Sequence, residues 1–150
     1  MPFHLSPVIQ TLSTHVDTFN GQTASFQFRL SNDARFFWVL IIPEIADIVE
    51  LHDMKTESAT ELFLLARALG NHLQETLAAT KINSASIGNI VPQLHYHVVA
   101  RFDDDAAWPG PIWGHGTPEP TSADMISERS SIIRAFLATQ NQTKPLVNCS

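Results

Sequence analysis

The chain has 150 residues, 44% of them hydrophobic, and a formal net charge of −6 at pH 7. This length and this apolar content predict one globular domain with a buried core. Because extended nucleic acid is bound chiefly by clusters of Lys and Arg, and the nine basic residues here are dispersed, the composition argues against a DNA- or RNA-binding module.

The N-terminal third contains three periodic segments. Apolar residues at helical spacing predict a helix over residues 6–16, which Asn20-Gly21 would end. Strict alternation of apolar and polar residues over 23–30 predicts a half-buried strand. The near-continuous apolar run over 36–42 predicts a central strand that is covered on both faces, joined to the previous strand by a turn at 31–33.

The rest of the chain predicts one long helix and further strands on either side of it. The elements expected in chain order are a loop over 44–53 with a helical turn near 45–49, the long helix over 56–79, a strand over 81–86, a loop over 87–92, a strand over 93–100 and a helix over 122–139. Gly70, inside the long helix, suggests a close contact with a neighbouring element. Strands without strict β-α-β alternation predict an α+β fold with an antiparallel sheet and its helices on one face.

Residues 93–99, which read Gln-Leu-His-Tyr-His-Val-Val, combine a core pattern with a polar one. Successive side chains of a strand point to opposite faces, so Gln93, His95 and His97 share one face while the apolar residues share the other. Two imidazoles on one face can divide the work of a nucleophile and a proton donor near neutral pH. The alternative is that both are ordinary half-exposed strand residues.

This stretch resembles the signature of the histidine triad (HIT) superfamily, His-φ-His-φ-His-φ-φ with φ apolar, except that Gln93 stands where the first histidine should be. The wider run over residues 88–101 and the Trp-Pro-Gly-Pro-Ile-Trp-Gly run over 108–114 are similar to a bacterial branch of that family with the same glutamine. The resemblance extends from about Leu30 to Gly114. It implies a single HIT-like domain with about five antiparallel strands, a core at about 23–114 and a C-terminal helix, and it implies a homodimer.

The resemblance implies a nucleotide hydrolase or nucleotidyl transferase that acts on purine nucleotides such as adenosine phosphoramidates or dinucleoside polyphosphates. His95 would attack the α-phosphorus and form a nucleotidyl-histidine intermediate, while His97 would bind phosphoryl oxygens and help to protonate the leaving group. Gln93 could donate hydrogen bonds but cannot titrate, which puts the rate and the preferred leaving group in question. This chemistry requires no metal or other cofactor.

Four further residues match substrate-binding positions of the family. Asn32 would bind the ribose hydroxyls, whereas Asn83, Gly88 and Asn89 would lie near the phosphate. Each has a purely structural alternative, because Asn and Gly are also the ordinary residues of turns. Arg101 could hold either a phosphate or a carboxylate.

Two other functions fit the same residues. The protein could bind a nucleotide with little or no turnover, or it could hold a metal ion through His95 and His97, for which His115, Asp103 or Gln93 would have to supply another ligand. The acidic run over 103–105 could bind magnesium or lie in a solvated loop.

Two tryptophans follow the histidine-containing stretch in the sequence. Trp108 and Trp113 could stack on a nucleobase, or close the core or a dimer interface. Residues 1–10 lack the features of a secretory signal, no apolar run is long enough to cross a bilayer, and a cytoplasmic protein is expected. The single cysteine, Cys149, excludes an intrachain disulfide.

Overall fold

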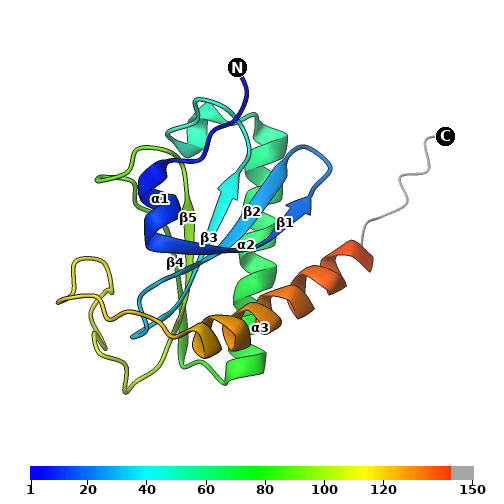
Figure 1. Ribbon diagram of the computed structural model, residues 1–150. Coiled ribbons are helices and arrows are strands. Elements are labelled where there is room, and N and C mark those ends of the chain that lie inside the picture. Colours follow the sequence, from blue (N-terminus) through cyan, green and yellow to red (C-terminus); the bar gives the residue numbers. More distant parts are fainter. Residues whose placement is uncertain (143–150) are drawn as a thin grey trace.

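A computed structural model describes residues 1–142, and Cys149 lies outside the described residues. Five strands form one antiparallel sheet in the order β1-β2-β3-β5-β4. Figure 1 shows α1 on one side of this sheet and α2 on the other. The elements in chain order are α1 (Pro7–Leu12), β1 (Ser13–Asn20), β2 (Ser25–Ser31), β3 (Phe37–Pro43), the 3-10 helix η1 (Leu51–Asp53), α2 (Thr56–Leu77), β4 (Lys81–Ser86), β5 (Tyr96–Arg101) and α3 (Ala123–Gln142).

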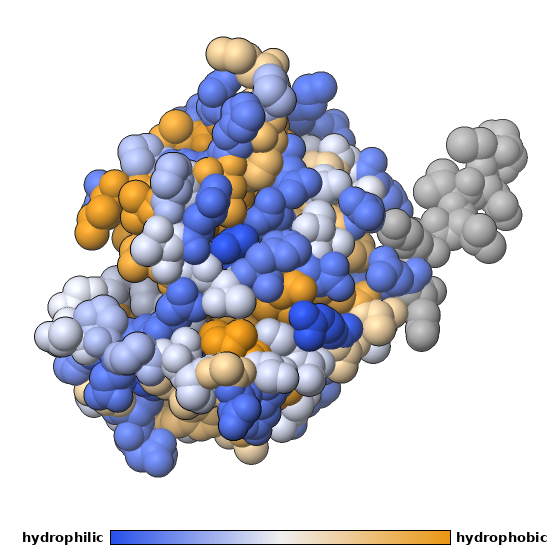
Figure 2. Space-filling model, viewed as in Figure 1, coloured by the Kyte–Doolittle hydropathy of each residue, from blue (hydrophilic) through white to orange (hydrophobic). Residues whose placement is uncertain are grey.

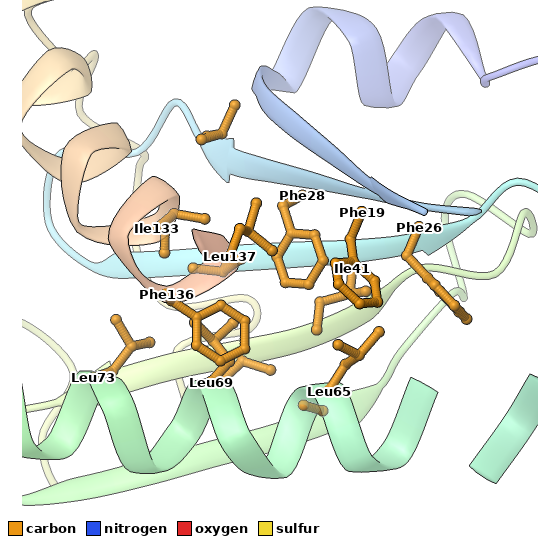
Figure 3. Close-up of a cluster of buried hydrophobic side chains, with 14 of the residues drawn as sticks. Phe19, Phe26, Phe28, Ile41, Leu65, Leu69, Leu73, Ile133, Phe136 and Leu137 are labelled. Atoms are coloured by element: carbon orange, nitrogen blue, oxygen red, sulfur yellow. The ribbon is translucent and has the colours of Figure 1, made fainter. Parts of the chain in front are cut away.

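The main core lies between the sheet and the two long helices. Phe136 of α3 packs between Leu69 and Leu73 of α2 and Phe28 of β2, and the two phenylalanine rings are 6.0 Å apart (Figure 3). All four side chains are at most 1% exposed. The predicted α+β fold, an antiparallel sheet of five strands with one long helix and a C-terminal helix, is therefore confirmed.

The other face of the sheet is covered by irregular segments and α1. Ile9 packs on Leu40 and Ile42 of β3, and Phe3 and Leu5 extend this cover. The loop that follows β5 covers the neighbouring surface with a second cluster, made up of Phe36, Val99, Ala107 and Ile112 together with Trp38 and Trp113. The sequence predicted helices on one face only, which is wrong for the short helix α1. The second face is covered by α1, the residues before it and the loop after β5.

Most predicted elements are confirmed, but the strand predicted over 93–100 begins only at Tyr96, so Gln93 and His95 precede it, and the first predicted helix is too long. The long helix begins at the predicted residue, and β4 has the predicted bounds. The helix predicted over 6–16 is wrong beyond Leu12, because β1 starts at Ser13. The register of β1 against β2 shifts between His15 and Asp17, which marks a β-bulge. The bulge buries Ser13, Val16 and Phe19 at a spacing of three, which imitates a helical period.

The helical turn expected near 45–49 is displaced to η1, where the side chains of Glu50 and Asp53 form a reciprocal capping box. The close contact suggested by Gly70 is confirmed, since a Cβ atom there would lie 3.2 Å from Cγ2 of Ile82.

Within residues 1–142, no helix combines the length and the hydropathy that a membrane span needs.

The C-terminal cap of α2 offers a test of local backbone energetics. Ala78 adopts the left-handed conformation, with φ 52° and ψ 40°. A Cβ atom disfavours this conformation and glycine adopts it freely, so Ala78→Gly is expected to raise the free energy of unfolding by about 1 kcal/mol. Ala68→Gly, inside the same helix, should lower it by about 1 kcal/mol. Urea denaturation of both variants measures the two effects, and changes of the same sign would contradict the prediction.

Candidate active site

His95 and His97 lie side by side at the start of β5. His97 is in the strand, paired with Leu40 of β3 and Ala85 of β4. His95 is the residue immediately before the first residue of β5. The two imidazole centroids are 4.8 Å apart with an interplanar angle of 70°. Leu94 and Val98 point the other way into the main core, as the alternation predicted.

The hydrogen bond of His95 fixes which ring nitrogen carries the proton. Nδ1 lies 2.7 Å from the main-chain oxygen of Gln93, and because a carbonyl only accepts, Nδ1 must donate. In the neutral ring this leaves the lone pair on Nε2. No residue within 1–142 forms a hydrogen bond with this Nε2, although His95 as a whole is only 8% exposed. His95 is thus in the tautomer that a nucleophilic imidazole requires.

His97 is held in the opposite tautomer by two neighbours. Nε1–H of Trp38 donates to Nδ1 of His97 over 2.9 Å, and indole nitrogen can only donate. The proton of the neutral ring is therefore on Nε2, which donates to the main-chain oxygen of Ile87 over 3.2 Å. Burial, assisted by the nearby His95, lowers the pKa of His97 from 6.5 to about 4, although the bond to Ile87 acts in the opposite direction. His97 is therefore neutral at physiological pH.

Two tryptophans enclose the His97 ring. Trp113 meets it edge to face at 5.4 Å between centroids, and Trp38 and Trp113 are 6.3 Å apart. Nε1 of Trp113 is the one buried side-chain polar atom without a hydrogen bond in the described part of the chain. Of the alternatives for Trp113, the structure has it in the second core cluster and against His97. Trp38 was not among the site residues that the sequence predicted, although an indole N–H within an apolar strand indicates that a hydrogen-bond partner is needed.

Gln93 binds the N-terminal segment through its side-chain amide. Oε1 accepts a hydrogen bond from the main-chain nitrogen of Ser6 over 2.8 Å, and Nε2 donates to the main-chain oxygen of His4 over 2.8 Å. Its main-chain oxygen meanwhile accepts the proton of His95. The residue in the first triad position thus ties residues 4–6 to the peptide that orients His95.

The loop over 87–92 lies against His95. A Cβ atom on Gly88 would be 3.9 Å from Cε1 of His95 and 3.0 Å from the main-chain oxygen of Val91, so the loop backbone passes close to the imidazole. Asn89 is exposed in this loop, and so is Ile90. Figure 2 shows hydrophobic side chains at the surface near α1 and this loop. The predicted phosphate-binding segment is therefore adjacent to His95.

Asn32 lies away from the two histidines. It follows the end of β2, two strands from His97 in the sheet. Its Nδ2 donates to the main-chain oxygen of Thr11 over 3.2 Å, and its Oδ1 accepts from the hydroxyl of Thr14 over 2.7 Å. These bonds join α1, β1 and the turn after β2. A contact of Asn32 with ribose stays a prediction.

Arg101 holds the loop that follows the site strand. The guanidinium donates to both carboxylate oxygens of Asp105 over 2.7 and 3.0 Å, and also to Oδ1 of Asn83 over 2.7 Å and the main-chain oxygen of Gly110 over 2.8 Å. It also lies 5.6 Å from the ring centroid of Trp108. Of the two partners considered for Arg101, the structure selects the carboxylate. Asn83 is part of this network, and a contact with substrate phosphate stays a prediction for it.

The described residues do not gather a ligand set around the histidine pair. Within residues 1–142, no three His, Cys, Asp or Glu side chains lie together in a way that could hold a metal ion. Asp103 and Asp104 are exposed, whereas Asp105 binds Arg101. His115 contributes its main-chain oxygen to Arg35. A large hollow of about 720 Å³ between α2, β4 and α3 contains neither site histidine.

The geometry matches what comparison with known proteins finds. The HIT domain profile matches residues 17–104, which is more than half of the chain. The chain belongs to the HIT domain family. This confirms the family resemblance based on the residues around His95, and the profile starts before the Leu30 at which that resemblance began.

Solved structures of HIT proteins superpose on most of the chain. A histidine triad protein from Sinorhizobium meliloti has 32% identity and a TM-score of 0.81 over 89% of this chain and 96% of its own. One from Bradyrhizobium japonicum has 28% identity and a TM-score of 0.83 over 91% and 99%. One from Marinobacter aquaeolei has 27% identity and a TM-score of 0.83 over 93% and 98%. A search of curated proteins gave no match.

Proposed function

We propose that this HIT protein is a nucleotide hydrolase or nucleotidyl transferase that acts at the α-phosphate of a purine nucleotide through His95. The observation that carries the proposal is the tautomer of His95. Its Nδ1–H is bonded to the Gln93 carbonyl, and no hydrogen bond within residues 1–142 occupies its Nε2 lone pair. An imidazole needs both properties to attack phosphorus. Membership of a family that generally binds or hydrolyses nucleotides supports the choice of substrate.

The proposed reaction has two displacements. The Nε2 lone pair of His95 attacks the α-phosphorus, a P–N bond forms, and the bond to the leaving group breaks with its electron pair on the leaving atom. Water then attacks the same phosphorus, loses a proton, and the P–N electron pair returns to Nε2. The proton stays on Nδ1 and donates to the Gln93 carbonyl, whose oxygen stabilises the positive charge that the ring carries in the intermediate.

The loop beside His95 is the proposed phosphate site. Charge that develops on phosphoryl oxygens requires fixed donors, and the close approach of the backbone at Gly88 supports main-chain N–H groups of this loop in that role. The exposed amide of Asn89 would supply a further donor. The resemblance adds Asn32 and Asn83 as substrate contacts, which substitution with Ala would test through KM.

The decisive experiment follows AMP release from an adenosine phosphoramidate and from diadenosine polyphosphates in the presence of a chelator. Wild-type protein is expected to release AMP from at least one of them, and His95→Ala is expected to lose this activity by at least 10³-fold, as for other covalent nucleophiles. His52→Ala, an exposed histidine outside the site, is the matched control and should retain the rate. Mass spectrometry of wild type denatured at alkaline pH, where the P–N bond to histidine survives, should find an adenylyl group, and His95→Ala should carry none.

Other results would favour the alternative functions. AMP binding by the wild type without turnover of any substrate would favour a nucleotide-binding module. Activity that disappears with the chelator and returns with a stoichiometric metal would favour a metal protein. Equal activity in wild type and His95→Ala would contradict the proposal.

A further inference from the structure

We infer that Trp38 is a positioning residue that withholds the His97 proton from the reaction, and that the site consequently prefers substrates whose leaving group departs unprotonated, namely nucleotide phosphoanhydrides. The inference rests on the proposed function and selects between its two substrate types. It differs from the role in leaving-group protonation that the family resemblance gives to His97.

The hydrogen bonds of His97 occupy both of its ring nitrogens. Nδ1 accepts the indole N–H of Trp38, so it carries no proton to give. The proton on Nε2 is engaged with the carbonyl of Ile87. Donation of that proton would leave an anionic imidazole in a side chain that is only 3% exposed, because Trp38 can supply no proton in return. To act as an acid, His97 would first have to be doubly protonated, which the indole N–H at Nδ1 opposes.

The other triad position does not replace this acid. Gln93 cannot titrate, and both ends of its amide bind the main chain of His4 and Ser6. The Nδ1 proton of His95 is held by the Gln93 carbonyl and is needed there once the ring bonds to phosphorus. His4 is exposed at the end of this hydrogen-bond chain, and its imidazole is the alternative donor that an experiment has to exclude.

The two substrate types differ in what their leaving groups need. When the P–O bond of a phosphoanhydride breaks, the electron pair stays on an oxygen of the nucleoside polyphosphate, a stable anion that takes a proton from water afterwards. When a P–N bond breaks, the departing nitrogen must receive a proton during the step, since an amide anion is too basic to leave. General acid catalysis typically contributes 10²–10⁴-fold. A site without an acid therefore disfavours the phosphoramidate.

Trp113 provides a matched control for Trp38. Both indoles contact the same imidazole, with ring centroids 5.6 Å away for Trp38 and 5.4 Å for Trp113. Only the N–H of Trp38 is bonded to it, whereas that of Trp113 has no partner within the described residues. Substitution of either residue with Phe removes an indole N–H and keeps an aromatic ring, so the comparison isolates the hydrogen bond.

The test is the ratio of kcat/KM for a diadenosine polyphosphate to that for an N-alkyl adenosine phosphoramidate. For wild type this ratio should be on the order of 10² or more. Trp38→Phe should lower it at least tenfold, because Nδ1 of His97 can then accept a proton, and Trp113→Phe should leave it unchanged. ¹⁵N NMR of His97 should find an unprotonated Nδ1 in wild type and Trp113→Phe, and a changed signature in Trp38→Phe. A loss of folded protein lowers both rates together and does not move the ratio.

Three results would overturn the inference. The first is a wild-type ratio near one while His95→Ala is inactive, which leaves the proposed function intact. The second is an equal change of the ratio in Trp38→Phe and Trp113→Phe. The third is a selective loss of phosphoramidate activity in His4→Ala, which would identify His4 as the acid. Absence of AMP release from both substrates would overturn the proposed function and this inference together.

Discussion

Arg101→Met is expected to lower the free energy of unfolding by about 3–5 kcal/mol, the usual cost of removing one partner from a buried ion pair. Arg101 is 1% exposed and sits at the end of β5. Its four hydrogen bonds reach a carboxylate, a side-chain amide and a main-chain oxygen. Methionine fills much of the same volume but leaves the carboxylate of Asp105 buried without its cation. The loop after β5, which carries Trp113 to the His97 ring, should loosen as a result.

Chemical denaturation at constant pH measures the loss. Arg67→Met, at an exposed position of α2, is the matched control and should change stability by no more than about 0.5 kcal/mol. The free energy of unfolding of Arg101→Lys should lie between those of Arg101→Met and Arg67→Met. An ammonium group keeps the charge but cannot reproduce the planar fork that binds both oxygens of Asp105. Comparable stabilities of the Arg101 and Arg67 variants would show that the network contributes little.

The fold was predictable where periodicity is a local property of the chain. The apolar stripe of α2 and the alternation around His95 each report on one element, and the structure confirms both. The strand β1 was missed because its bulge at Val16 changes the side-chain period, and a bulge depends on the pairing with β2. The cover of the second sheet face was also missed. The residues that bury this face are distant in sequence from the strands they cover, so no local pattern predicts the contact.

In the site, the residues that are close in sequence were predicted, and the partners that come from distant segments were not. His95, His97 and Gly88 lie within ten residues of one another, and the structure brings them together. The partner of His97 comes from Trp38, which becomes its neighbour only because β3 pairs with β5. The bonds of Gln93 to residues 4–6 span almost ninety positions of the chain. A strand order deduced beforehand would have pointed to Trp38, but no pattern in the sequence identifies the partners of Gln93.

The neutral state of His97 predicts a loss of stability in mild acid. The folded pKa of about 4 lies below the ordinary value of 6.5, so the unfolded chain binds a proton more readily than the folded protein does. Above pH 6.5 the ring is neutral in both states and its contribution to stability is complete. As the pH falls from 6.5 toward 4, only the unfolded chain takes up the proton, and stability falls by about 3 kcal/mol at 1.36 kcal/mol per unit of pKa difference.

The difference between wild type and His97→Asn isolates this effect, because every other titrating group is common to both proteins. The amide oxygen of Asn can accept the N–H of Trp38 without titrating, so the variant should keep a partner for the indole. Denaturation between pH 4 and 7 should give a wild-type stability that falls more steeply than that of His97→Asn, with the two curves parallel above pH 6.5. Parallel curves over the whole range would mean that His97 accepts a proton as easily in the fold as in water, and that burial beside His95 does not hold the ring neutral.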